Sequence, residues 1–551
     1  MDLLGEGIRY VEANVLDKYY EKQPLLQRCQ IEAVSHLLKV YGNLVREFDA
    51  AELLQLATNT WLTEQNLWSR ALEQSLRWVL KHCKPSSTFS KDPWRTIDEE
   101  ALLLLSWARS YVKLCDDHTS ASRGLCVASL NEDLHEIRFQ LKDTAEFNVY
   151  LSQMAAHPLH VNEVFKEFPS KELDNLFNQW KSKINFDKLD EPESLPLFEN
   201  NFSHPNQIPI KQWTRLTILP ELDDCENLNG FTLGDLRDFW ACLFLECKLI
   251  ARLENHVDNV VGDENDLGSV MLQGSLVEVS EYLANSFKID AQVILEIINC
   301  LTFDQNSHKS TLSNSPFIKT ECGTMSLLCR LVIGIDPYIM IASALAKRSR
   351  KLKLIYETLI HKIEKVNVIH IGEQFRNLGF TVLTEEVLTG KDNSKICPDL
   401  IVYDQESHQI LVADYKHAIP PIGASEVGNR ILDLEKWKEQ IRRYLQFFDK
   451  NEEMIRGRLG CKSTAQIYGM LLFRWEMVIP VPIETDITYA DWLSLSDILK
   501  KIEKPIISEI SRFFRLPRDA DQVACHWEVG EESIQVDKWT YRRPIIILNP
   551  E

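Results

Sequence analysis

Apolar residues recur at helical spacing through most of the first 300 positions. Leu26, Ala33, Leu37 and Val40 follow one such stripe, and side chains three, four or seven positions apart share a face of a helix. Polar, proline-containing segments interrupt the pattern, the longest at residues 187–210. The pattern predicts a helical region over residues 1–190 and a second, mainly helical region over residues 211–345.

The pattern changes after residue 350, where short runs rich in β-branched and apolar residues alternate with helical spacing. The helices are expected at residues 354–378 and 432–448, and the strands at 381–387, 399–403, 409–416 and 466–476. A polar turn at residues 404–408 separates two of the strands as a hairpin loop does. The chain therefore predicts a third domain, α/β in class, over residues 346–551. A second hairpin, at residues 522–529 and 533–541, is expected to extend this domain.

Two of the predicted strands carry charged residues. Asp399 follows Pro398, and the string Asp414-Tyr415-Lys416 ends the next strand. Because alternate side chains of a strand point to the same face, Asp414 and Lys416 project together. Pairing with the preceding strand brings Asp399 beside them. Two carboxylates are suitable ligands for Mg²⁺ or Mn²⁺, and a nearby ammonium would place a positive charge beside a phosphate under attack.

The two flanking helices add further polar positions. Glu373 lies seven residues after Val366, which places it on the face predicted to meet the sheet. Gln440 and Tyr444 lie four residues apart and share a face of the later helix.

With these elements in this order, residues 352–480 resemble the PD-(D/E)XK nuclease superfamily, and the Asp-Tyr-Lys and Gln-x-x-x-Tyr strings resemble its RecB-type branch. The resemblance implies a restriction-endonuclease-like α-β-β-β-α-β core. It implies a metal bound by Asp399, Asp414 and the carbonyl of Tyr415, with Glu373 acting through water. It also implies that Lys416 polarises the attacking water and that Gln440 and Tyr444 position the strand.

Two plainer interpretations stand beside this one. Asp414 and Lys416 are also consistent with an ordinary solvated ion pair on an edge strand. In that interpretation Asp399 is simply a turn residue. A nuclease fold can also persist without its chemistry. The sequence thus favours a metal-dependent nuclease whose helical N-terminal region recognises substrate, a protein partner or a trigger, in defence or repair. The alternative is an inactive nuclease-fold scaffold or nucleic-acid-binding protein.

Charge restricts how such a protein contacts nucleic acid. The formal net charge of −20 over 551 residues argues against binding through the overall field, so contacts must be local. Lys436, Arg442 and Arg443 on the later helix are the expected contacts, with DNA preferred over RNA. Gly460-Cys461-Lys462-Ser463 lacks the spacing of an ATP-binding phosphate loop.

The remaining composition predicts a cytoplasmic protein. The 13 cysteines form no Cys-x-x-Cys pair, so neither a zinc site nor a disulfide framework is expected. The chain start lacks a signal-peptide pattern. The most apolar run, residues 331–346, is broken by Asp336 and Pro337, which argues against a membrane span.

Overall fold

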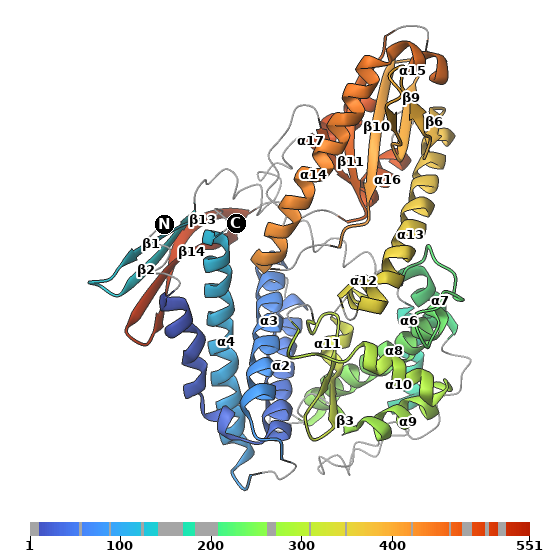
Figure 1. Cartoon of the computed structure of the whole chain (residues 1–551). Coiled ribbons are helices and arrows are strands. Elements are labelled where there is room, and N and C mark those ends of the chain that lie inside the picture. The colour runs from blue at the N-terminus through green and yellow to red at the C-terminus, as the bar shows by residue number, and fades with distance from the viewer. Residues whose placement is uncertain are drawn as a thin grey trace.

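The protein combines a helical bundle, a second helical body and an α/β sheet, as the computed structural model in Figure 1 shows. The predicted combination of helical regions with an α/β part is confirmed. The structure describes residues 10–53, 58–86, 90–122, 126–141, 169–181, 208–261, 271–307, 310–334, 336–347, 350–419, 423–461, 464–475, 487–501, 506–515 and 525–550. No helix in these ranges is long and apolar enough to cross a membrane.

The N-terminal part is built on long helices that share one hydrophobic core. The elements are the 3-10 helices η1 (Leu16–Lys22) and η2 (Pro24–Gln27), followed by α2 (Gln30–Leu53), α3 (Thr58–His82) and α4 (Trp94–Ser122). Ala33, Leu37 and Val40 of the predicted stripe are buried in this core, together with Leu72 and Leu104. Helical spacing alone therefore located the inward face of α2.

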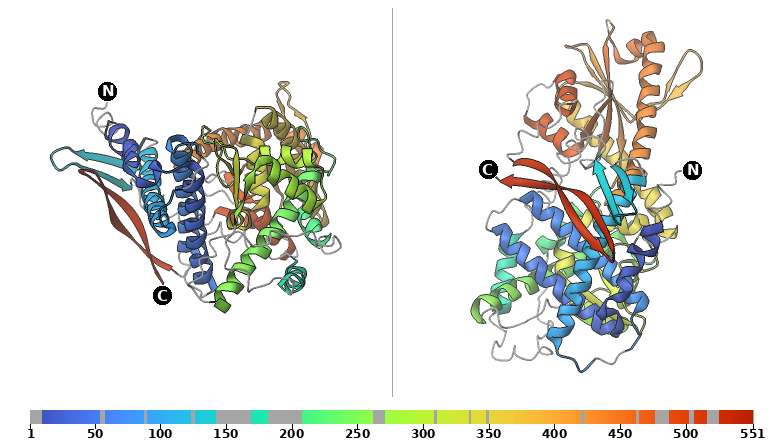
Figure 2. Two further views of the ribbon diagram at one scale, coloured as in Figure 1. Left: turned by 90° about the horizontal axis from the view of Figure 1, so that it is seen from below. Right: turned by 90° about the vertical axis from the view of Figure 1, so that its left-hand side faces the viewer.

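A β-sheet covers one side of the bundle and joins residues 126–141 to residues 525–550. Its order is β1 (Cys126–Asn131), β2 (Glu136–Leu141), β14 (Trp539–Pro550) and β13 (Cys525–Val536). β14 runs parallel to β2, with Thr540 opposite Glu136, and the right-hand view of Figure 2 shows the two hairpins side by side.

The C-terminal hairpin was predicted, but its turn and its location differ from the prediction. The chain reverses at Asp537, which adopts a left-handed backbone conformation, rather than at residues 530–532. The hairpin pairs with β2 and does not extend the α/β sheet. The reason is burial, because Val536 and Tyr541 are fully enclosed in the N-terminal core.

The middle part is a second helical body with its own core around Phe239, Trp240 and Phe244. Its elements are α6 (Ser170–Lys181), α7 (Ile208–Thr217), α8 (Leu233–Val261), β3 (Met271–Ser275), α9 (Leu276–Phe287), α10 (Ala291–Cys300), β4 (Phe317–Lys319), β5 (Thr324–Leu328), α11 (Cys329–Ile333) and α12 (Pro337–Lys347). In a small sheet, β5 pairs antiparallel with both β3 and β4.

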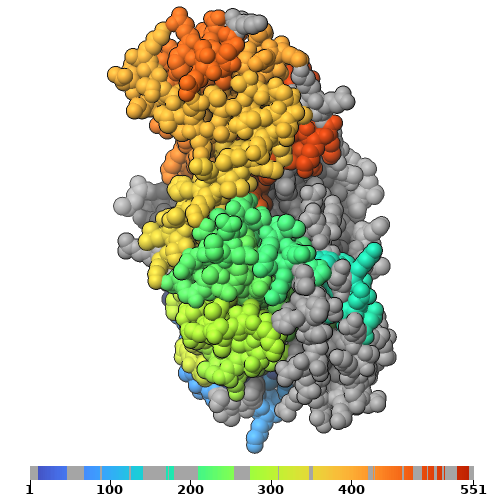
Figure 3. Space-filling model, turned by 90° about the vertical axis from the view of Figure 1, so that its right-hand side faces the viewer, coloured from blue at the N-terminus to red at the C-terminus, as the bar shows by residue number. Residues whose placement is uncertain are grey.

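Helix α13 (Arg350–Asn377) belongs to two cores. Tyr356, Leu359 and Ile363 of its first half pack in the core of the middle part, whereas Ile371 and Phe375 of its second half pack against the α/β sheet. One hydrophobic core therefore continues across the domain boundary that was predicted at residue 346. In Figure 3 the α/β part rests directly on the middle part.

The α/β part is a five-stranded sheet between two helical layers. Its order is β12 (Ile487–Asp491), β11 (Gln466–Phe473), β10 (Gln409–Lys416), β9 (Leu400–Asp404) and β6 (Thr381–Thr384). β6, β9 and β10 are antiparallel neighbours, and β11 and β12 run parallel to β10. α14 (Gly423–Lys450) makes the crossover from β10 to β11 and covers one face, while α13, α16 (Trp492–Lys501) and α17 (Ile507–Arg515) cover the other.

The predicted helices and strands of this part are present, but both helices begin earlier than predicted and two strands end earlier. β6 stops at Thr384 and β11 at Phe473. A short hairpin, β7 (Leu388–Thr389) with β8 (Lys395–Ile396), precedes β9, and α15 (Glu452–Leu459) follows α14. α16 and α17 follow β12 along the chain. β12 was not predicted, and it ends where Asp491 accepts a hydrogen bond from the amide of Ser494 (2.8 Å), as a residue before a helix often does.

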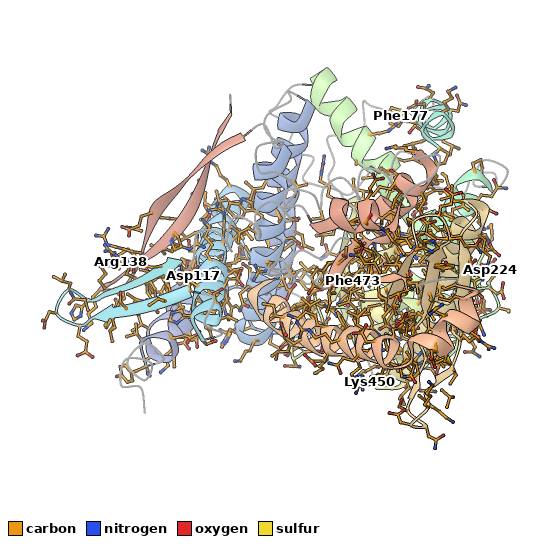
Figure 4. All side chains as sticks on the ribbon, turned by 90° about the horizontal axis from the view of Figure 1, so that it is seen from above. Asp117, Arg138, Phe177, Asp224, Lys450 and Phe473 are labelled. Atoms are coloured by element: carbon orange, nitrogen blue, oxygen red, sulfur yellow. The ribbon has the colours of Figure 1, made fainter. Side chains whose placement is uncertain are left out.

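The ion pairs that attach β14 to α4 provide a test of this architecture. Arg543 donates to the largely buried carboxylate of Asp117 (2.6 Å) and to Glu532 (3.0 Å). Burial raises the pKa of Asp117 to about 6, and Arg543 opposes that rise. Figure 4 shows Asp117 of α4 close to the β1–β2 hairpin.

We expect Arg543→Ala to destabilise the N-terminal part by about 2–4 kcal/mol, because the largely buried Asp117 loses its counter-charge, whereas Glu532 keeps Lys113. Thermal unfolding followed by circular dichroism measures this. Arg542→Ala is the matched control, because Arg542 is more exposed and bonds Glu136 and Glu531 on the sheet, where ion pairs contribute little. Equal effects of the two substitutions would contradict the buried pairing.

Candidate functional site

Strand β10 separates its side chains onto the two faces of the sheet. Ile410 and Val412 pack in the core beneath α14, whereas Leu411, Ala413 and Tyr415 pack in the core beneath α13. Continuing the alternation places Asp414 and Lys416 on the α14 face at the carboxyl end of the strand. The predicted shared face of this acid-lysine pair is thus confirmed.

Asp399 is the residue directly before β9, and it lies next to this pair. Its Oδ2 accepts a hydrogen bond from the amide of Tyr415 (2.8 Å), and the charge of Asp414 is close enough to raise its pKa. Lys416 forms a close ion pair with Asp414, whose side chain is 1% exposed. The predicted convergence of Asp399, Asp414 and Lys416 is therefore present.

Burial and the neighbouring carboxylate dominate the electrostatics of this cluster. Burial, followed by the charge of Asp414, raises the pKa of Asp399 to about 8, against the opposing effects of the Tyr415 amide and Lys416. Near neutral pH the Asp399 carboxyl group accordingly holds a proton.

Gln440 and Tyr444 of α14 reach the cluster, as their spacing predicted. The Gln440 side-chain amide accepts from Lys416 (3.3 Å) and donates to Asp414 (3.3 Å) and to the Tyr444 hydroxyl (2.6 Å). Tyr444 in turn donates to the carbonyl of Cys397 (3.3 Å). Burial raises the pKa of Tyr444, so the phenol remains a donor. These two side chains tie the start of β9 to the end of β10.

Glu373 does not reach the cluster, and this prediction is wrong. Its side chain is exposed on α13, because the face chosen from Val366 is itself 43% exposed. The face that meets the sheet instead carries Val368, Ile371 and Phe375. Glu364 lies four residues before Val368 and continues this stripe toward the site.

Glu364 is thus the acidic residue of α13 that was missed. Its Oε1 accepts a hydrogen bond from the amide of His417 (3.1 Å), directly after Lys416. Burial raises its pKa, while the positive charge of Lys416 acts in the opposite direction and the charge of Asp414 adds to the rise. The signal that finds it is the spacing Glu364, Val368, Ile371 and Phe375, at four, three and four residues.

His417 is a second residue that the sequence analysis did not select. It is 8% exposed, and its Nε2 hydrogen-bonds with the hydroxyl of Tyr356 (3.1 Å). Burial lowers the pKa of His417 to about 4. It is therefore a neutral, packed side chain near pH 7 that anchors the end of β10.

The predicted nucleic-acid contacts on α14 divide into two groups. Lys436 and Arg443 lie four residues before and three after Gln440, so they share its side of the helix, and both are exposed. Arg442 lies on another side and donates to Glu439 (2.8 Å). Lys436 also lies 3.5 Å from Asp433. Of the three, Arg443 and Lys436 are the better placed to meet a substrate at the site.

The donor set suits a hard divalent cation that retains water. Among the described residues, no three acidic, histidine or cysteine side chains form a group that could hold a metal. Two carboxylates and water are nevertheless a common environment for Mg²⁺. In the described part of the chain, Oδ2 of Asp414 is buried without a hydrogen-bond donor, although the Lys416 ammonium contacts it. Asp399 and Asp414 are therefore suitable ligands for such a divalent cation.

Comparison with known proteins leaves the family open. No family model matches the sequence, and no curated protein and no solved structure gives a match. The geometry of the site is therefore the basis for a proposed function.

The raised pKa of Asp399 predicts a specific dependence of stability on pH in the presence of a chelator. Between its ordinary pKa of 3.8 and its folded value of about 8, the folded protein holds a proton that the unfolded chain has released. This contribution to stability is complete at low pH and is lost as the pH rises through about 8.

We expect the melting temperature of the wild type, relative to Asp399→Asn, to fall steadily between these limits. The asparagine variant lacks the titrating group and serves as the reference. Differential scanning fluorimetry in EDTA measures both curves, and parallel curves would contradict the assignment.

Proposed function

We propose that the protein is a metal-dependent nuclease that hydrolyses phosphodiester bonds in nucleic acid, with DNA as the first substrate to test. The order α13, β6, β9, β10, α14, β11 is the order that the PD-(D/E)XK superfamily resemblance implies, which supports the proposed core. The observation that carries the proposal is the convergence of Asp399, Asp414 and Lys416 at one end of β10.

Each side chain of the cluster has a proposed role. Asp399, Asp414 and the Tyr415 carbonyl would hold Mg²⁺ or Mn²⁺, which supplies Lewis-acid stabilisation of phosphate charge and orients water. Lys416 holds the attacking water and offsets negative charge that develops on the phosphate. Gln440 fixes both Lys416 and Asp414 through its two amide atoms. Glu364 takes the place expected for Glu373 and holds the main chain after Lys416.

The helical parts are proposed to contribute to recognition of substrate or of a protein partner. His417, next to Lys416, lies 5.9 Å from the ring of Tyr338 on α12, measured between ring centroids. A nucleic acid bound at Lys416 would consequently lie close to the middle part. Arg443 and Lys436 supply positive charge on the α14 side.

An inactive protein that binds nucleic acid through the same fold is the second candidate. The lack of a three-residue metal group among the described side chains favours it. Dependence on a divalent cation separates the two candidates, because a binder requires neither the cation nor the charge of Asp414.

We expect purified protein to cleave DNA with Mg²⁺ or Mn²⁺ and not in EDTA. Asp414→Ala should reduce cleavage to background, and Lys416→Ala should reduce it by about 100- to 1000-fold, because a preorganised charge at the transition state is lost. The assay compares linear, circular, single-stranded and double-stranded DNA, with RNA in parallel.

Two substitutions on α13 give a matched pair for the same assay. Glu364→Ala should lower cleavage at least about tenfold, as losses of residues that orient metal ligands do, whereas exposed Glu373→Ala should leave it within about twofold. Undiminished cleavage by both Asp414→Ala and Lys416→Ala would refute the proposed site. Loss of activity in Glu373→Ala alone would restore the original assignment.

A further inference from the structure

The carboxyl end of the sheet, where the proposed site lies, is held by residues of the middle part. Lys416 of β10 pairs with Phe473 of β11, so Arg474 and His417 directly follow two paired positions on neighbouring strands. The guanidinium of Arg474 forms a close ion pair with Glu221, in the segment between α7 and α8. The Glu221 side chain is 7% exposed and that of Arg474 is 17% exposed. This is a buried charge pair between two parts of the chain.

Aromatic rings surround the same point. The guanidinium carbon of Arg474 lies 4.0 Å from the ring centroid of Tyr338 on α12. The Tyr338 ring in turn lies 5.0 Å from that of Trp475 and 5.9 Å from that of His417. Tyr338 thereby packs against residues that follow both β10 and β11.

Glu221 also holds the helix on the other side of the site. Its carboxylate accepts from the Tyr338 hydroxyl (3.4 Å) and from the side-chain amide of Asn367 on α13 (3.4 Å). Asn367 lies one helical turn after Glu364, the residue that holds the His417 amide. One carboxylate therefore links α12, α13 and the end of β11.

We propose that Glu221 and Tyr338 are positioning residues for phosphodiester cleavage, so that the middle part completes the active site. They fix His417 and Arg474, and through these residues the ends of β10 and β11 that present Asp414 and Lys416. The inference rests on the proposed nuclease function and adds to it that residues before α13 are required for turnover. It also predicts which side chains of the interface matter.

Removing either partner of a buried ion pair leaves the other without its counter-charge, and the surroundings rearrange to solvate it. At this position a rearrangement moves His417, and with it the adjoining Lys416. A shift of about 1 Å in a catalytic group is enough to lower turnover by about 100-fold. Substrate binding through Arg443 and Lys436 on α14 is not affected by the same shift.

The experiment measures kcat and KM for DNA cleavage with Mn²⁺ in the full chain. Glu221→Ala and Tyr338→Ala should each lower kcat by about 10- to 100-fold, with KM changed less than about twofold and with a higher Mn²⁺ concentration needed for half-maximal rate. Tyr338→Phe keeps the ring and should recover most of the activity. Glu221→Gln keeps the shape of the side chain and should fall between wild type and Glu221→Ala.

Glu226→Ala is the matched control. Glu226 joins Lys362 of α13 (2.7 Å) across the same interface. Within the described ranges it forms no hydrogen bond or ion pair with Arg474 or Tyr338, and its loss should leave kcat unchanged. Thermal unfolding confirms that each variant is folded, and Tyr338→Phe and Glu221→Gln serve if an alanine variant is not.

The outcomes separate the two levels of the proposal. A cleaving wild type with unchanged kcat in Glu221→Ala and Tyr338→Ala overturns the positioning role alone. Equal losses in Glu226→Ala and Glu221→Ala overturn it as well, because they indicate a general effect of the interface. A wild type that cleaves nothing with either cation overturns the nuclease function and this inference with it.

Discussion

Helix α13 is the physical constraint on which the arrangement of the molecule depends. Its 28 residues span roughly 40 Å as a rigid rod, and its two halves are buried in two different cores. Each of the two cores is completed by one half of this helix. The sheet and the middle helical body are therefore held in one orientation, and the end of β10 lies beside α12.

The charge distribution at the end of β10 is the second determinant. Two neighbouring carboxyl groups, those of Asp399 and Asp414, lie close to one ammonium in a largely buried setting, and Glu364 adds a third acid nearby. Such an arrangement does not stabilise the fold, because burial penalises each unneutralised charge. Local features that oppose stability are concentrated at functional sites. The surrounding apolar cores, in which Phe448 and Phe375 are fully buried, compensate for the free-energy cost of this charged cluster.

Alternation along β10 and the four-residue spacing of Gln440 and Tyr444 were enough to predict most of the site from sequence, because both patterns are local. Glu373 was misplaced because α13 presents different faces to two bodies along its length, so Val366 was a misleading guide to the face that meets the sheet. The pairing of β14 with β2 and the ion pair of Arg474 with Glu221 were not predictable, since they join segments with no common local pattern. β12 was missed because its five residues carry no strong apolar run of their own, and their burial comes from two cores, with Ile487 on the α14 side and Ala490 on the side of α16 and α17.

The parallel pairing of β14 with β2 has a consequence for how the chain is made. Thr540 and Glu136 are partners about 400 positions apart, and synthesis at about 5–20 residues per second separates their emergence from the ribosome by tens of seconds. During that interval the β1–β2 hairpin exposes an open edge, while the sheet that carries Asp399, Asp414 and Lys416 has already emerged. β13 and β14 thus close the edge of β2 only at the end of synthesis. Chains interrupted before residue 540 leave this edge free to pair with strands of other molecules.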